Sequence, residues 1–155
     1  MNVYEYAMKV EKEGEAYYRE MAAAASNAGL KKIFTMLADE EVKHYNVFKN
    51  MMKKEDMNLE DLDLITDTET IFKTLSEEKD NVSFDIDQIQ FYKDAIAREE
   101  ASQDFYAQKA EDLESAKEKK IFLHIANEET KHKRILEEIV IFLEEPADWV
   151  ASAEF

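Results

Sequence analysis

A fourteen-residue phrase occurs twice in this chain. KKIFTMLADEEVKH, residues 31–44, returns as KKIFLHIANEETKH, residues 119–132, with nine identical positions. An internal repeat constrains architecture more firmly than local propensity, because each copy is expected to fold into the same unit and to pack against its relative. The offset of 88 residues predicts two repeats, about residues 2–54 and 86–144, within a single domain that spans residues 1–155.

The sequence between the turn signals favours long helices. Only two Gly and one Pro occur in 155 residues, which indicates few breaks in regular structure. Residues of the types that cap helix N-termini precede four long stretches; they are Asn2, Asn27, Asp85 and Ser115. The sequence therefore predicts an all-α protein with helices over about residues 2–26, 27–54, 85–114 and 115–145.

The connection between the second and third helices, residues 55–84, is too long for a hairpin. A helix of about 25 residues spans about 37 Å, which about a dozen extended residues can cover. The connection can therefore cross the whole bundle, with a short helical piece over residues 68–78. We expect a four-helix bundle in which the helices run up, down, down and up, with one long crossover.

Apolar residues at spacings of three and four define one inward face on each helix. Acidic and imidazole side chains interrupt each face near the middle of its helix, with a single Glu on the first and third helices and Glu-x-x-His on the second and fourth. The interrupting residues are Glu11, Glu41, His44, Glu99, Glu129 and His132.

Helical phase separates these residues from adjacent polar ones. At about 100° per residue, Glu41 and Glu129 lie within about 20 to 40° of the centre of the apolar arc. Glu40 and Glu128 lie about 80° away from it, so they are not assigned to the inward face. His124 is also outside the central stripe, and we expect it to be partly exposed and not to bind metal.

Four carboxylates inside a bundle would cost several kcal/mol each if they were ionised and unpaired. Two divalent cations would balance their charge, and the two histidines would supply one nitrogen to each ion. Oxygen-rich ligation with imidazole suits iron or manganese. The chain has no Cys, which excludes thiolate zinc sites and a built-in iron–sulfur or rubredoxin-type carrier, so electrons would come from outside.

At these residues the chain resembles the ferritin-like dinuclear carboxylate proteins, and among them most the rubrerythrin branch. The likeness covers both helix pairs and includes Glu11-x-x-Gly-x-x-Tyr-Tyr18 and Glu99-x-x-Ser-x-x-Phe-Tyr106. It implies a ferritin-like bundle that holds two iron ions, or manganese. It further implies bridging by Glu41 and Glu129, terminal ligation by Glu11 and Glu99, and nitrogen ligation by His44 and His132.

The resemblance also suggests a catalytic part for Tyr18 and Tyr106, which could donate hydrogen bonds to ligand carboxylates. The chain departs from rubrerythrins at Ser102, where they carry an extra carboxylate, and in lacking a rubredoxin module. The implied function is an oxidoreductase that reduces hydrogen peroxide or dioxygen with an external donor such as a rubredoxin. A storage protein of ferritin type and a metal-free interaction bundle are the alternatives.

Charge and hydropathy narrow the possible partners. The net charge of −16 argues against binding to nucleic acid or to acidic membranes. No apolar run is long enough to span a membrane and no signal peptide is recognisable, so we expect a cytoplasmic protein. Rubrerythrin-like bundles commonly pair, and the aromatic tail with Trp149 and Phe155 is expected to dock on the bundle or on a second copy. We therefore expect a homodimer.

Overall fold

The computed structural model describes residues 1–26, 28–54, 73 and 86–144, and long helices account for nearly all of them. The four helices are α1 (Val3–Ala24), α2 (Ala28–Met52), α4 (Ile86–Asp112) and α5 (Ala116–Glu144). No strand occurs in this described part of the chain. The prediction of an all-α four-helix bundle is confirmed.

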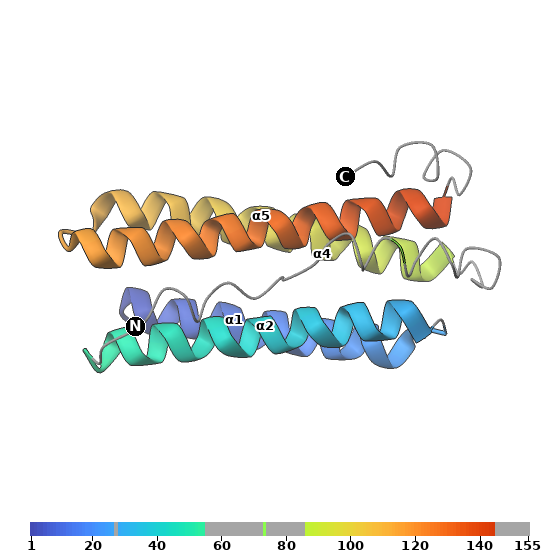
Figure 1. Ribbon diagram of the computed structural model, residues 1–155, viewed down its shortest axis with the longest axis horizontal. Coiled ribbons are helices and arrows are strands. Elements are labelled where there is room, and N and C mark those ends of the chain that lie inside the picture. Colours follow the sequence, from blue (N-terminus) through green and yellow to red (C-terminus); the bar gives the residue numbers. More distant parts are fainter. Residues whose placement is uncertain (27, 55–72, 74–85, 145–155) are drawn as a thin grey trace.

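The helices form two layers, with α1 beside α2 in one and α4 beside α5 in the other (Figure 1). Helices α1 and α5 run in one direction along the bundle, and α2 and α4 run in the other. Helix α4 therefore begins at the end of the bundle opposite to the end of α2. This gives the predicted order of directions, while the path of the crossover itself lies outside the described residues.

Side chains of the predicted type cap two of the helices. The Asn2 side chain accepts a hydrogen bond from the Glu5 backbone N–H at 2.8 Å, and Ser115 Oγ accepts one from the Glu118 backbone N–H at 3.2 Å. Each bond satisfies a donor that has no partner within its helix. Asn27 and Asp85, the other two predicted caps, lie outside the described residues.

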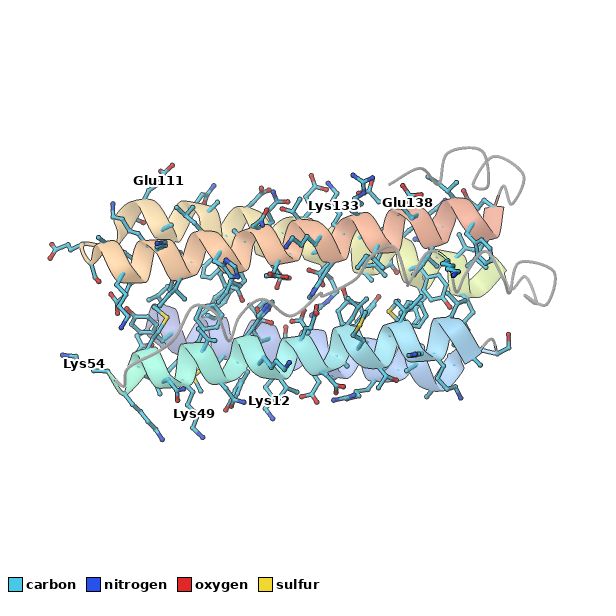
Figure 2. The ribbon with its side chains drawn as sticks, viewed as in Figure 1. Lys12, Lys49, Lys54, Glu111, Lys133 and Glu138 are labelled. Atoms are coloured by element: carbon cyan, nitrogen blue, oxygen red, sulfur yellow. The ribbon has the colours of Figure 1, made fainter. Side chains whose placement is uncertain are left out.

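The apolar residues of the bundle form two clusters, one towards each end. One cluster includes Met21, Phe34 and Leu136, and the other includes Phe48 and Phe122. Charged side chains point outward from both layers (Figure 2), including Lys12, Lys49, Lys54, Glu111, Lys133 and Glu138. The two clusters leave the middle of the bundle to the polar residues that interrupt the inward faces.

Two further expectations concern segments that lie wholly or almost wholly outside the described residues. The first is the short helical piece over residues 68–78, of which the structure describes only residue 73, and the second is the burial of the tail around Trp149 and Phe155. Among the helices that the structure describes, none combines the length and the apolar character needed to cross a membrane.

Candidate metal centre

All six residues that interrupt the inward faces converge at the middle of the bundle. They form two overlapping groups, and within each group the potential ligand atoms lie within 4.8 Å of one another. The first group is Glu11, Glu41, His44 and Glu129, and the second is Glu41, Glu99, Glu129 and His132. Glu41 and Glu129 belong to both, so two carboxylates join two sets of ligands.

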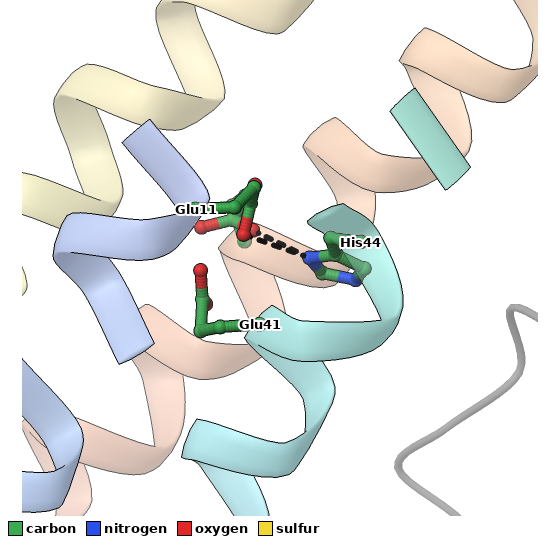
Figure 3. A group of neighbouring side chains, drawn as sticks. Glu11, Glu41 and His44 are labelled. Atoms are coloured by element: carbon green, nitrogen blue, oxygen red, sulfur yellow. Dashed lines mark ion pairs between the residues drawn. The ribbon is translucent and has the colours of Figure 1, made fainter. Parts of the chain in front are cut away.

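The centre is shielded from solvent on every side. Glu99 is the most exposed of the six residues, and only 5% of its surface is accessible. Figure 3 shows Glu11 on α1 facing Glu41 and His44 on α2 across the layer. Because α1 and α2 are antiparallel and only a few residues separate them in the sequence, residues at similar distances from this connection lie at the same height.

Each imidazole presents its Nδ1 atom to two carboxylates. His44 Nδ1 lies 3.4 Å from Glu11 Oε2 and 3.1 Å from Glu129 Oε1. On the other side, His132 Nδ1 lies 3.2 Å from Glu41 Oε1 and 3.6 Å from Glu99 Oε1. The two rings are stacked, with centroids 5.9 Å apart, so the two halves place their nitrogen donors in equivalent surroundings.

Two tyrosines bind carboxylates across the layers. Tyr106 Oη on α4 donates to Glu11 Oε1 at 2.7 Å, and Tyr18 Oη on α1 donates to Glu99 Oε1. Burial and then the nearby Glu99 raise the pKa of Tyr18 well above its ordinary value, and burial and Glu11 do the same for Tyr106. Both hydroxyls therefore remain protonated donors and fix the rotamers of their partners.

The surroundings divide the four carboxylates into two kinds. Burial, reinforced by the charges of neighbouring carboxylates, raises the pKa of Glu41 and of Glu129 well above the usual range. Burial also opposes ionisation of Glu99, but its contacts with Glu129, His132 and Tyr18 outweigh that and lower its pKa to about 2. The pKa of Glu11 is lowered in the same way, against burial, by Glu41 and His44. Two carboxyl groups therefore favour the neutral form without a cation.

A metal site is expected to contain buried polar atoms that have no hydrogen-bond partner within the protein. Every one of the six contributes such an atom: Glu11 Oε2, Glu41 Oε1, His44 Nδ1, Glu99 Oε2, Glu129 Oε1 and His132 Nδ1. Leaving a buried polar group unpaired costs about 1 to 3 kcal/mol, and more for a charged one. Metal ions would satisfy these atoms together, so the donor set fits a dinuclear centre.

Gly14 makes room for one of the shared carboxylates. A Cβ atom at this position would lie 2.7 Å from Glu41 Oε2, closer than real Cβ contacts allow. The corresponding position in the second repeat, 88 residues later, is Ser102. The absence of a side chain on α1 is therefore part of how Glu41 reaches the centre.

The assignment of Glu40 and Glu128 to positions away from the interior is wrong. Glu40 is 2% exposed and Glu128 is 0% exposed, and Glu40 Oε2 lies 2.5 Å from His132 Nε2. Each of α2 and α5 faces both its layer partner and the opposite layer, so its buried arc is wider than its apolar stripe. The only sequence signal for this burial was that each repeat carries two adjacent glutamates. As expected, His124 is partly exposed, with 30% of its side chain accessible.

Comparison with known protein families matches residues 2–140 to the family described as Rubrerythrin. The match contains the first repeat, the second repeat as far as residue 140, and all six residues of the centre. Comparison with curated proteins and with solved structures gives no match.

Proposed function

The chain belongs to the rubrerythrin family, and from this premise we propose that it is a di-iron oxidoreductase that reduces hydrogen peroxide or dioxygen. The observation that carries the proposal is the pair of four-residue ligand groups that share Glu41 and Glu129. Shared carboxylates suit a dinuclear centre, since they can hold two ions close together while neutralising part of the charge of both.

The proposed ligand roles follow from this sharing. Glu41 and Glu129 would hold both ions. Glu11 and His44 would complete the ligands of one ion, and Glu99 and His132 those of the other. Donors of this kind, mostly carboxylate oxygens with one imidazole nitrogen for each ion, suit iron and also accept manganese.

Two ferrous ions held at the centre would supply two electrons as they become ferric, which is the number required to convert one hydrogen peroxide and two protons into two waters. The chain contributes the geometry. The hydrogen bonds from Tyr18 and Tyr106 hold Glu99 and Glu11 in place. Burial of the six residues excludes bulk water, which strengthens electrostatic interactions at the centre.

A pocket on the α1–α4 side suits the approach of a small oxidant. It is lined by residues that include Val10, Arg98 and Ser102, the sequence neighbours of Glu11 and Glu99 among them. Ser102 leaves space where rubrerythrins carry a further carboxylate. We place the oxidant on this side, and we expect the electrons to come from a separate donor such as a rubredoxin, with two copies of the chain pairing as a homodimer.

The test combines metal analysis with rapid kinetics on the iron-loaded protein. We expect about two iron ions per chain, and oxidation of the reduced centre by hydrogen peroxide much faster than by air-free buffer. Glu99→Gln should lose both properties, and Glu100→Gln is the matched control because the neighbouring Glu100 side chain is 58% exposed. A large closed assembly with many iron ions per chain would instead indicate storage, and a chain that binds no metal would overturn the proposal.

A further inference from the structure

A second pair of buried carboxylates lies beside the six residues of the centre. Potential ligand atoms of Glu40, Glu128 and His132 lie within 4.8 Å of one another. Glu40 Oε2 is occupied by His132 Nε2, while the Nδ1 atom of the same ring faces the centre. One imidazole therefore joins this pair, on α2 and α5, to the proposed metal centre.

Three of the four carboxylate oxygens of this pair lack a hydrogen bond. Both oxygens of Glu128 are buried without a hydrogen-bond partner, and so is Glu40 Oε1. Two nitrogen atoms lie near Glu128 Oε1, His124 Nε2 at 3.5 Å and Lys131 Nζ at 3.7 Å, both too distant for a good charge-assisted hydrogen bond. Burying the ionised Glu128 carboxylate, which is 0% exposed, costs free energy when it has no hydrogen-bond partner. A bound divalent cation would offset that cost.

The repeat shows that a different arrangement would satisfy these groups, but it is not formed. Glu40 contacts His132. If the two repeats exchange roles, the equivalent contact would join Glu128 to His44. Instead, His44 Nε2 has no hydrogen-bond partner. The second repeat also carries His124 where the first has Met36, which gives Glu128 a polar neighbour that Glu40 lacks. Glu128 is thus directed towards Glu40 and His124 and remains available to a ligand.

These residues also connect the buried centre with the surface. The His124 side chain is 30% exposed and that of Lys131 is 40% exposed, whereas Glu128 and His132 are both 0% exposed. A cation can therefore meet His124 first, then Glu128 and Glu40, and finally the ligands of the centre. The long Lys131 side chain can move into solvent as the cation arrives.

We propose that Glu40 and Glu128 hold a third divalent cation beside the dinuclear centre, and that ions reach the centre through this site from His124. The inference rests on the proposed function for the existence of the centre, but it uses different residues. It explains why two further glutamates are buried, although the four carboxylates of the centre already balance the charge of two divalent ions.

The test uses Mn²⁺ as the probe on the full chain. Anomalous diffraction from crystals soaked with Mn²⁺ should show two ions at the centre and a third between Glu40 and Glu128. Glu128→Gln keeps the shape of the side chain and removes its charge, so it should abolish the third signal and keep the other two. The same variant should load the centre several-fold more slowly in stopped-flow mixing.

Two further variants separate this site from general effects. His124→Met copies the residue of the first repeat and should slow loading while the final occupancy of the centre is unchanged. Glu137→Gln makes the same change as Glu128→Gln at an exposed position of α5 and should behave as wild type.

Each outcome decides one part of the proposal. Two signals in the wild type, with Glu128 bonded to His44 Nε2 instead, would overturn the third site and leave the dinuclear centre intact. A third signal with unchanged loading in Glu128→Gln would overturn its part in the route. No bound Mn²⁺ at any of these residues would overturn both this inference and the proposed function.

Discussion

Gly14 illustrates how a single missing side chain can serve a metal centre. Gly14→Ala would place a Cβ atom 2.7 Å from Glu41 Oε2, so the carboxylate must move away from its present position. The helix itself should gain about 0.5 to 1 kcal/mol, because Gly in a helix interior is less favourable than Ala. We therefore expect an unchanged or higher Tm without metal, together with at least about tenfold weaker Mn²⁺ binding.

The control for this prediction is Ser102→Ala, at the corresponding position of the second repeat, which should alter Mn²⁺ affinity little. Calorimetric titration measures the affinities, and thermal unfolding in a chelator measures the Tm. Equal Mn²⁺ affinity for Gly14→Ala and wild type would show that Glu41 does not need the space beside Gly14.

The two buried tyrosines make a separate prediction about stability. Tyr106→Phe removes the 2.7 Å hydrogen bond to Glu11 and leaves a buried carboxylate oxygen without its donor. A hydrogen bond to a charged group contributes about 1.5 to 3 kcal/mol, so the free energy of unfolding should fall by about that amount. Tyr4→Phe removes a comparable 2.8 Å bond to Glu118 at a partly buried site, and its effect in urea titrations should be smaller. Similar losses in the two variants would contradict the prediction.

At the scale of single residues, the helical pattern correctly predicted which acidic side chains are buried on helices whose apolar stripe is narrow. Glu11 and Glu99 are buried as their phase requires, because each is the only acidic residue in the middle of its stripe. Phase failed at Glu40 and Glu128, because a periodicity calculation for one helix cannot see that a second layer covers its flank. The need for space beside Gly14 could not be predicted from the sequence either, because it depends on the Glu41 side chain from another helix.

Helix α5 gives a test at the scale of an element. Ser115 Oγ is the acceptor for the Glu118 backbone N–H at the start of this helix. Ser115→Ala removes this acceptor, and we expect a loss of about 1 kcal/mol in the free energy of unfolding. Ser115→Asp keeps an acceptor and places a negative charge at the helix N-terminus, so it should restore most of the loss. Urea unfolding of the metal-free protein measures both, and identical stability of the Ala variant and wild type would contradict the prediction.

The helices were predictable from the sequence because their interiors contain so few breaks, but their ends were less so. Helix α2 ends at Met52, two residues before the predicted end at Lys54, whose φ angle of 59° lies in the left-handed region. No Gly marks this end, so the sequence offers no signal for the change of direction. Helix α5 ends at Glu144. This agrees with the position of Pro146, because the residue before a proline is disfavoured in helical conformation.

For the whole molecule, the buried charges link stability to pH in opposite ways with and without metal. The raised pKa values of Glu41 and Glu129 mean that the folded protein holds their protons more tightly than the unfolded chain. Their contribution is complete below the ordinary value of 4.5 and is lost as pH rises. His132 acts in the same direction above 6.5, although burial alone would lower its pKa, because Glu99 and Glu40 raise it. The lowered pKa of Glu99, about 2, has the opposite sign and matters only in acid.

Metal reverses this dependence, because the same groups must be deprotonated to bind cations. In a chelator, we expect the Tm to decrease between about pH 5 and about pH 8, with each raised group contributing up to about 1.4 kcal/mol per pH unit. With excess Mn²⁺, the gain in Tm over the chelated protein should increase across the same range. Differential scanning calorimetry at a series of pH values measures both curves. Glu41→Gln has one titrating group fewer and should show a shallower decrease in chelator, whereas a Tm that rises with pH in the chelated wild type would mean that these carboxyls are not held neutral in the bundle.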